Sequence, residues 1–318
     1  MIHILGSGSI GCVIASKIQR PVSLICRTMP KQHSLIYELP DGVTSTFEND
    51  CVLVQNASTI TPISKLIVCT KAGEDTYNAV SSVQHALSKD SSILFLQNGF
   101  KRNEKLIKDT NLEKKSQILN SMITFGAFLR EKFHVVDAGT GILRTSTHLE
   151  EPLNDNSKEL IDVLMKTNYT IEVVPPKDLE NTLKSKIAVN CVVNMLGALL
   201  KATSGELYEK AYVSNDQIMP SNEQLIYDVL REVCEVLDLD LASTADLTRK
   251  ASLATYTNFN STARDYHIKN LTMPETEIKY ITGYVIEEGK AKGIPTPVNN
   301  TLYNLFAMMS HLRELKQV

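Results

Sequence analysis

The sequence lacks any arrangement of cysteines that suits a disulfide framework or a zinc site. Its six cysteines are scattered through apolar segments, and no two of them form a C-x-x-C pair. Such cysteines are typical of reduced, packed thiols in a reducing compartment. The histidines at positions 267 and 311 also lack metal-like companions, so we expect no metal site.

The sequence also lacks an excess of charge of either sign, since its formal net charge is −3 over 318 residues. This balance gives no reason to expect nucleic acid or an anionic membrane as a partner. No uncharged apolar run reaches the ~18–20 residues needed to span a bilayer. An apolar run begins at residue 2 and leaves no room for a signal or transit peptide, so we expect a cytoplasmic location.

The chain of 318 residues is longer than one ordinary core accommodates, so two domains are expected. The first part alternates strand-like and helix-like segments, which predicts right-handed βαβ crossovers and a mostly parallel sheet. Pro175-Pro176 is the strongest breaker, and the chain beyond it has helical periodicity. We therefore predict an α/β protein, with a Rossmann-type doubly wound sheet domain over residues 1–175 and an all-helical domain over residues 176–318.

The individual elements are predicted from hydrophobic period and turn residues. The pair Asp41-Gly42 predicts a hairpin turn inserted in the first domain. Strands are expected at residues 2–5, 22–26, 65–70, 92–97 and 170–174, with a strand-rich stretch at 117–147. Helices are expected after the first strand to about residue 19, and at residues 75–87, 157–166, 178–201, 222–237, 244–258, 275–292 and 300–315.

A glycine-rich motif follows the first expected strand and opens a helix. In ILGSGSIG, Gly6 allows a tight turn, Gly8 lets a pyrophosphate approach the backbone, and Gly11 lets helix and strand pack closely. Unpaired N–H groups at the helix start would hold the phosphates. This context favours a dinucleotide over a glycine-rich turn without ligand. The predicted cofactor loop is Gly6, Ser7, Gly8, Ser9, Ile10 and Gly11.

The end of the second expected strand indicates which dinucleotide binds. An NAD site usually places Asp or Glu there, to bind the ribose 2′-hydroxyl. The segment LICRTMPK has Arg27 at that position, with Lys31 close behind. A guanidinium can form paired, charge-assisted hydrogen bonds with a 2′-phosphate, which a carboxylate would repel. The missing acid therefore favours NADP(H) over the alternative that Arg27 is only a solvated loop charge.

A polar stripe crosses the most apolar helix of the second part. In KSKIAVNCVVNMLGALL, Lys186, Asn190 and Asn194 are four residues apart, so their side chains drift only ~40° per step along one face. Buried polar groups need partners, so the stripe predicts either a polar ligand or hydrogen bonds between helices. Cys191 lies ~100° from Asn190 and is expected to be a core thiol, not a nucleophile.

Several motifs, in order along nearly the whole chain, resemble those of the ketopantoate reductases (2-dehydropantoate 2-reductases). The opening ILGSGSIG is similar to the start of that family. CTKAGED matches its lysine at a strand end, so the resemblance places Lys71 beside cofactor and substrate. LQNGF matches its Asn-Gly pair, which implies that Asn98 contacts the nicotinamide ribose region and the substrate.

The second half carries the more diagnostic motifs of that family. KIAVNCVVNMLGAL is similar to one of its helices, with the polar stripe in register. NSTARDY resembles its Ser-x-x-x-Asp segment, here Ser261 and Asp265. TEIKYITGYVIEEGKAKGIPTP matches its glutamate-containing helix, which puts Glu277 at the functional position.

The resemblance implies NADPH-dependent reduction of a 2-oxo acid in a cleft between the domains, most specifically 2-dehydropantoate to pantoate on the way to pantothenate and coenzyme A. Ketone reduction needs a hydride on carbon and a proton on the developing alkoxide. Lys186 is expected to stabilise that alkoxide and donate the proton. Glu277 is expected to hold the ammonium and to hydrogen-bond the product hydroxyl. Asn190, Asn194 and Ser261 are expected to bind the substrate's oxygens.

Two features of the second half keep alternatives open. The chain between Asp265 and Glu277 is longer than in typical bacterial members of the family, with HIKNLTMPE as the insertion. Glu275 is also available, so the role of Glu277 depends on how TEIKYITG aligns with the family's helix.

Two alternative functions stay open. They are a non-catalytic NADP(H)-binding sensor or scaffold and a reductase of another branched 2-oxo acid. The expected partner is a small-molecule substrate, and the chain is expected to be a monomer or a homodimer.

Overall fold

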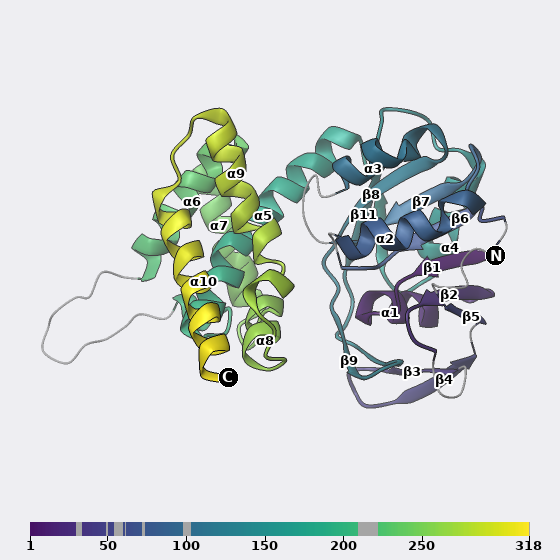
Figure 1. Ribbon diagram of the computed structural model, residues 1–318, viewed down its shortest axis with the longest axis horizontal. Helices are drawn as coiled ribbons and strands as arrows, with labels where there is room; N and C mark the ends of the chain where they lie inside the picture. The colour runs from purple at the N-terminus through teal and green to yellow at the C-terminus, as the bar shows by residue number, and fades with distance from the viewer. Residues whose placement is uncertain are drawn as a thin grey trace, which may run out of the picture. The chain divides into compact units, whose positions relative to one another are not determined.

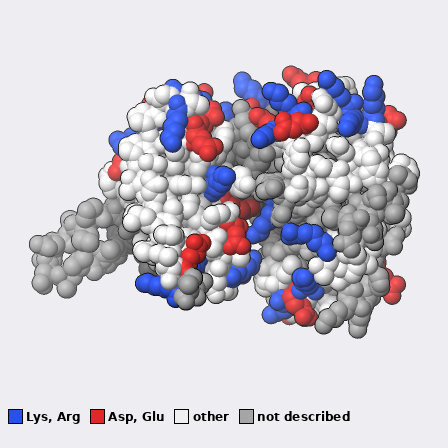
Figure 2. Space-filling model, viewed as in Figure 1, with Lys and Arg blue, Asp and Glu red and all other residues white. Residues whose placement is uncertain are grey.

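The structure is a computed structural model that describes residues 1–29, 34–48, 50–53, 60, 62–71, 74–97, 103–208 and 222–317. It divides into two compact units, Met1–Glu180 and Asn181–Val318. The division falls within helix α5 (Pro176–Leu200), whose first residue follows the boundary expected after residue 175. Figure 2 shows basic side chains interspersed with acidic ones on the visible face of each unit.

The N-terminal unit is built on an eight-stranded sheet (Figure 1). Neighbouring strands are parallel except for one antiparallel pair, β8 with β11. The order β12-β11-β8-β7-β6-β1-β2-β5 confirms the predicted doubly wound sheet. The strands are β1 (Ile2–Leu5), β2 (Val22–Cys26), β5 (Asp50–Leu53), β6 (Lys65–Val68), β7 (Ser92–Phe95), β8 (Gln117–Ile123), β11 (Ile142–Thr147) and β12 (Thr170–Val173).

Helices cover both faces of this sheet, which is why its central strands are apolar at successive positions. In β1, Ile4 belongs to one buried cluster and Leu5 to the other. Residues of α1 and α4 complete the first cluster, and residues of α2 and α3 complete the second. These helices are α1 (Ser9–Lys17), α2 (Glu74–Val83), α3 (Glu104–Thr110) and α4 (Asp155–Met165).

The strand order reverses beside β1, and this reversal locates a binding edge. The chain passes from β1 to β2 on one side, whereas β6 pairs with the other side of β1. In doubly wound sheets, ligands bind outside the carboxyl ends of the strands at such a switch point. The carboxyl ends of β2, β1, β6 and β7 therefore form the edge at which a cofactor site is expected.

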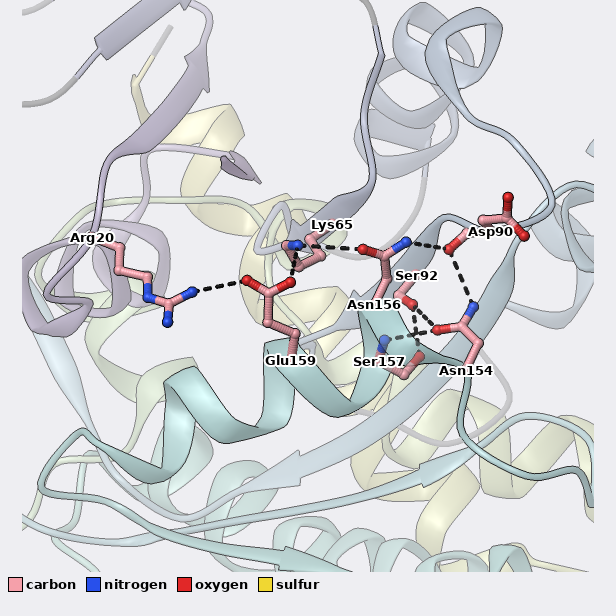
Figure 3. A network of polar contacts seen from close by, with 8 residues as sticks. All are labelled: Arg20, Lys65, Asp90, Ser92, Asn154, Asn156, Ser157 and Glu159. Atoms are coloured by element: carbon pink, nitrogen blue, oxygen red, sulfur yellow. Dashed lines mark hydrogen bonds and ion pairs between the residues drawn. The ribbon is translucent and has the colours of Figure 1, made fainter.

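The amino ends of the strands carry a polar network that attaches α4 (Figure 3). Asn154 caps this helix, because its side chain accepts a hydrogen bond from the backbone N–H of Ser157 at 2.7 Å. Ser92, at the start of β7, donates to Asn154 Oδ1 over 2.8 Å. Lys65, the first residue of β6, forms a 2.7 Å ion pair with Glu159 of α4. These contacts hold the helix against the starts of two strands.

A second, four-stranded sheet has the order β4-β3-β10-β9. Its first two strands form the predicted hairpin, in which Leu39 N donates to Val43 O over 2.8 Å and Gly42 has a φ of +87°. The strand-rich stretch at 117–147 contributes to both sheets, since β10 pairs with β3 and β9 while β11 pairs with β8 and β12. The strands are β3 (Ser34–Glu38), β4 (Thr44–Glu48), β9 (Ala127–Glu131) and β10 (His134–Asp137).

A buried ion pair joins α1 to this small sheet. Lys17 Nζ lies 2.6 Å from Asp137 Oδ2, and the two side chains are 8% and 2% exposed. Tyr37 and Tyr169 donate hydrogen bonds to the same carboxylate over 2.7 and 3.2 Å. Burial by itself would raise the pKa of Asp137, but the hydrogen bonds from Lys17 and Tyr37 and the Lys17 charge lower it. The unit therefore holds an ionised carboxylate in its interior, surrounded by donors.

A second carboxylate of the small sheet binds a guanidinium through two hydrogen bonds. Arg130 Nε and Nη2 donate to Glu38 over 2.7 and 2.6 Å, and His134 Nε2 lies 2.8 Å from Glu38 Oε2. The hydrogen bonds from Arg130 are the main reason that the pKa of Glu38 is lowered from 4.5 to about 2, against the opposing effect of burial. The Glu38 side chain thus links three strands in its ionised form.

We expect the stability of this unit to fall as the pH drops from about 4.5 to about 2. The folded pKa of Glu38 lies below its unfolded value. The stability from its ionised form is therefore present above the unfolded pKa and lost as the pH falls through the folded pKa. Glu38→Gln and Arg130→Met should each flatten the decline of Tm, because each removes the carboxylate–guanidinium pair. Melting curves across this window test the expectation, and equal slopes in all three proteins would contradict it.

The described residues of the C-terminal unit form helices and no strands, as predicted (Figure 1). The predicted helix over residues 275–292 is wrong at its start, because two short 3-10 turns precede it and Ile281 has a non-helical backbone (φ −110°, ψ −86°). The short helix α8 is not among the predicted elements. The helices are α5, α6 (Asn222–Leu237), α7 (Leu241–Ala254), α8 (Ser261–His267), α9 (Thr282–Lys292) and α10 (Pro297–Gln317).

Among the described residues, helix α5 is the one helix that combines membrane-spanning length with an apolar composition. By length and composition alone it could cross a membrane, contrary to the expectation drawn from uncharged runs, with a mean hydropathy of 1.4 over an 18-residue window. However, 56% of that window is buried inside the structure. The core helix of a globular unit has the same properties, and α5 is packed as such a helix.

Candidate active site

The glycine loop has the backbone that the sequence motif predicts. Gly6 has a φ of +109°, and a Cβ there would lie 2.9 Å from Thr70 N, so only glycine fits. A Cβ on Gly11 would overlap the carbonyl oxygen of Gly6. Because glycine has no Cβ, the helix can pack closely on the loop. A Cβ on Gly8 would meet nothing within 4 Å. The loop is tight on its protein side and open at Gly8, which fits the close approach of a pyrophosphate.

The start of α1 suits an anion. Gly8 is the N-cap, no side chain caps the helix there, and the first turn contains no acidic residue. The first N–H groups of a helix lack partners within the helix and carry its positive dipole end. Gly8 is exposed, and Ser7, Ser9 and Ile10 are partly exposed, so a ligand can reach these groups. These features fit the phosphates of a dinucleotide.

The structure brings the other predicted cofactor residues to the same edge. Arg27 is exposed and directly follows β2, and Lys71 is exposed and follows the end of β6. Because β2 and β6 are the parallel neighbours of β1, both residues flank the glycine loop. The predicted residues Lys31 and Asn98 lie outside the described residues.

The polar stripe of α5 runs from partly exposed positions into the buried part of the helix. Asn194 is 5% exposed and Lys186 and Asn190 are partly exposed, whereas Ile187 is 2% exposed. Cys191 is fully buried, and that burial raises the pKa of its thiol to about 12. Cys191 is therefore a core thiol, as predicted, since a reactive cysteine needs an accessible thiolate.

Helix α8 is attached to α5 by Asn260, which is not among the predicted site residues. Asn260 caps α8 by accepting from Ala263 N at 2.9 Å, and its amide donates to Val193 O of α5 over 2.8 Å. This bond ties the start of α8 to the residue before Asn194. Ser261 is the exposed first residue of α8. An asparagine before a helix-forming stretch is a capping signal, which could have identified this element.

A capping box distinguishes Glu275 from Glu277, the two candidates for the glutamate that acts with Lys186. Glu275 accepts hydrogen bonds from Thr272 N and Thr272 Oγ1 over 2.7 and 2.9 Å, so it serves its own 3-10 turn. Glu277 lies two residues later and is partly buried. The pairing of Glu277 with Lys186 remains a prediction from the sequence.

The chain between α8 and the 3-10 turns is held by α10. Arg313 donates to the carbonyls of Tyr266 and Leu271 over 2.6 and 2.7 Å, and its guanidinium lies 3.4 Å from the centre of the Tyr266 ring. Ser310 Oγ accepts from Met273 N at 2.9 Å. The apparent insertion is therefore anchored within the unit. No local signal in the sequence identifies Arg313, because its partners lie more than 40 positions away.

The fold and the glycine loop define a class of protein, the oxidoreductases that use a nicotinamide dinucleotide. Residues 2–150 match the family described as "Ketopantoate reductase PanE/ApbA", and residues 178–310 match "Ketopantoate reductase PanE/ApbA C terminal". Together these matches cover most of both units. The chain belongs to the ketopantoate reductase family, as the resemblance of its motifs predicts.

Curated relatives match along almost their full length. A probable 2-dehydropantoate 2-reductase of Schizosaccharomyces pombe is 27% identical, over 95% of this chain and 94% of that protein. A 2-dehydropantoate 2-reductase of Vibrio cholerae is 26% identical, over 95% of each. The likeness therefore extends over both units of this chain.

Solved structures share the fold. D-mandelate dehydrogenase with NADH and anilino(oxo)acetate has a TM-score of 0.81 at 20% identity, covering 98% of each chain. The PanE/ApbA family ketopantoate reductase from Ralstonia eutropha has a TM-score of 0.79 at 21% identity, covering 98% of this chain and 99% of that one. Both likenesses support the α/β sheet unit followed by a helical unit.

Proposed function

We propose that this chain reduces 2-dehydropantoate to pantoate with NADPH, a step toward pantothenate and coenzyme A. The observation that carries the proposal is the stripe of Lys186, Asn190 and Asn194 on a helix that is otherwise largely buried, in a member of this family. The reductase names of relatives that match over 94–95% of their length also support it.

In the proposed reaction, the N-terminal unit binds the cofactor and the C-terminal unit supplies the proton donor. NADPH, when bound at the glycine loop, supplies the hydride to the substrate's carbonyl carbon. Lys186 donates a proton to the developing alkoxide, whose charge its ammonium also stabilises. Glu277 holds that ammonium and accepts a hydrogen bond from the product hydroxyl.

The remaining residues bind and orient the ligands. Asn190 and Asn194 offer neutral donors and acceptors to the substrate's oxygens, and Ser261 binds its carboxylate. In the N-terminal unit, the loop from Gly6 to Gly11 holds the pyrophosphate and Arg27 the 2′-phosphate, with Lys71 and Asn98 at the nicotinamide end. We propose a cytoplasmic enzyme that acts as a monomer or a homodimer; one neighbour is a dimeric ketopantoate reductase from Staphylococcus aureus.

A second candidate is a reductase of another branched 2-oxo acid. The likeness to D-mandelate dehydrogenase favours it, because that fold is associated with a substrate other than ketopantoate. A non-catalytic NADP(H)-binding protein is less favoured, since a binder has no need for both Lys186 and Glu277. Oxidation of NADPH by the purified protein, across a panel of 2-oxo acids that includes ketopantoate and phenylglyoxylate, separates the three. The proposal requires ketopantoate to have the highest kcat/KM, and turnover of no acid would contradict it.

We expect NADPH to bind more tightly than NADH, with Arg27→Ala removing most of the difference. A lost charge-assisted pair is worth ~1.5–3 kcal/mol, about one to two decades in affinity. Calorimetric titration of both cofactors measures this. Arg20→Ala is the matched control, because Arg20 pairs with Glu159 near the amino ends of the strands. Equal affinities for NADPH and NADH in the unmutated protein would rule out the role given to Arg27.

A further inference from the structure

A buried polar cluster joins the carboxyl ends of β6 and β7 to the first turns of α2. It consists of Thr70, Thr76 and Gln97, and we call it the Thr76 cluster. Gln97 Nε2 lies 2.7 Å from the carbonyl oxygen of Thr70 and 2.7 Å from Thr76 Oγ1. Thr76 Oγ1 donates to the carbonyl oxygen of Lys71 over 2.7 Å, and the two threonine hydroxyls are 2.9 Å apart.

The hydrogen positions in this cluster follow from chemistry. A backbone carbonyl only accepts, so the Gln97 amide must donate to Thr70 O and the single Thr76 hydrogen must go to Lys71 O. Thr76 Oγ1 therefore accepts from both Gln97 and the Thr70 hydroxyl. The Thr76 hydroxyl, which is 1% exposed as a residue, then uses its donor and both acceptor positions.

The side-chain amide of Gln97 buries one polar atom without a hydrogen bond to any described residue. Its Oε1 is buried and has no hydrogen-bond partner among the residues that the structure describes. Exchanging the amide's oxygen and nitrogen would not help, because Thr70 O needs a donor. An apolar side chain would avoid the orphaned acceptor but would leave Thr70 O without this donor, so the contribution of the amide lies in the hydrogen bonds of its N–H groups.

The cluster holds the backbone of the cofactor edge. Thr70 lies against the glycine loop, since a Cβ on Gly6 would be 2.9 Å from its N atom. Lys71 follows Thr70, and Asn98, outside the described residues, follows Gln97 in the chain. The carbonyls of Thr70 and Lys71 are thus both fixed at the switch point beside β1.

The strand order indicates which half of the cofactor this cluster serves. Arg27, predicted to bind the 2′-phosphate of the adenosine half, follows β2 on one side of β1. The Thr76 cluster lies at β6 and β7 on the other side. With the pyrophosphate at the β1 loop between them, the nicotinamide half extends over β6.

We propose that Thr76 and Gln97 are positioning residues for the nicotinamide half of the cofactor. They hold the backbone from which Lys71 extends and thereby set where that side chain meets the cofactor. This inference rests on the proposed function, because it takes the glycine loop as the NADPH site.

The test compares two substitutions of one threonine and two ligands. Thr76→Val keeps the shape of the side chain and removes the hydroxyl, whereas Thr76→Ser keeps the hydroxyl and removes a methyl group. The ligands are NADPH and adenosine 2′,5′-bisphosphate, which has the 2′-phosphate but no nicotinamide half. We expect Thr76→Val to weaken NADPH binding by about tenfold or more and to leave the bisphosphate unaffected. Thr76→Ser should bind NADPH within about threefold of the unmutated protein.

Other outcomes overturn the inference. Equal weakening of both ligands by Thr76→Val would mean a general structural role, and greater weakening by Thr76→Ser would mean that the methyl group matters. If Thr76→Val does not fold, Gln97→Met provides the same test, because it removes the donors together with the orphaned acceptor. Failure of the unmutated protein to bind NADPH would overturn the proposed function as well. NADPH binding that is unchanged in a folded Thr76→Val protein would overturn this inference alone.

Discussion

Replacing Lys186 by alanine should lower turnover by about 10²–10⁴-fold, the usual contribution of a positioned general acid. The affinity for NADPH should change little, because the predicted cofactor residues belong to the other unit. Lys184→Ala is the matched control on the same helix, since two residues of an α-helix are about 200° apart and Lys184 lies outside the stripe. Steady-state kinetics, NADPH titration and Tm are measured on the same preparations.

A structural role for the stripe predicts a different result. The Lys186→Ala protein would then lose thermal stability while each folded molecule kept its turnover, and the catalytic role would be wrong. Glu277→Gln provides a second comparison, because a misplaced ammonium should also impair reduction. If Lys186 and Glu277 act as one unit, the double variant should be little worse than Lys186→Ala alone. Glu275→Ala, which removes the acceptor of the capping box, should alter stability more than kcat.

Replacing Lys17 by methionine should lower the free energy of unfolding of the N-terminal unit by about 3–5 kcal/mol. The substitution keeps most of the apolar stem, but it leaves the Asp137 carboxylate without its cation at a position where the side chain is 2% exposed. Tyr37 and Tyr169 still donate to the carboxylate, but they do not neutralise its charge. Urea titration followed by circular dichroism measures the change.

Two further variants separate the lost charge from lost packing. Lys158→Met removes an ion pair between two exposed side chains, Lys158 and Asp155. It should lower the free energy of unfolding by less than about 1 kcal/mol. Adding Asp137→Asn to Lys17→Met removes the uncompensated charge and keeps one acceptor oxygen, while the amide NH2 can donate to the other tyrosine hydroxyl, so part of the stability should return. A loss from Lys17→Met no larger than that from Lys158→Met would show that the buried pair contributes little.

Features whose physical cause lies within a few neighbouring residues, or whose burial shows in the pattern of apolar residues, are predictable from the sequence. Gly11 is predictable because the clash that it avoids is with Gly6 of the same loop, and Gly6 is predictable because its positive φ is a local requirement of the tight turn. The Asp41-Gly42 turn is predictable because the positive φ of Gly42 is a local requirement. The buried strands have long apolar runs because helices cover both faces of the sheet, and this burial is readable in the sequence. The resemblance to the family's motifs predicts the catalytic and substrate-binding roles of the polar stripe, and these roles stay predictions.

Contacts between side chains that are far apart in the chain are visible only in the folded structure. The pair Lys17–Asp137 joins residues 120 positions apart, and the Gln97–Thr70 bond joins two strand ends. Hydrophobic period reports that a residue is buried, but not which partner satisfies a buried polar group, because that depends on how elements far apart in the chain are packed. The capping contacts of Glu275 with Thr272 are local, whereas the packing that leaves Glu277 partly buried depends on the tertiary structure.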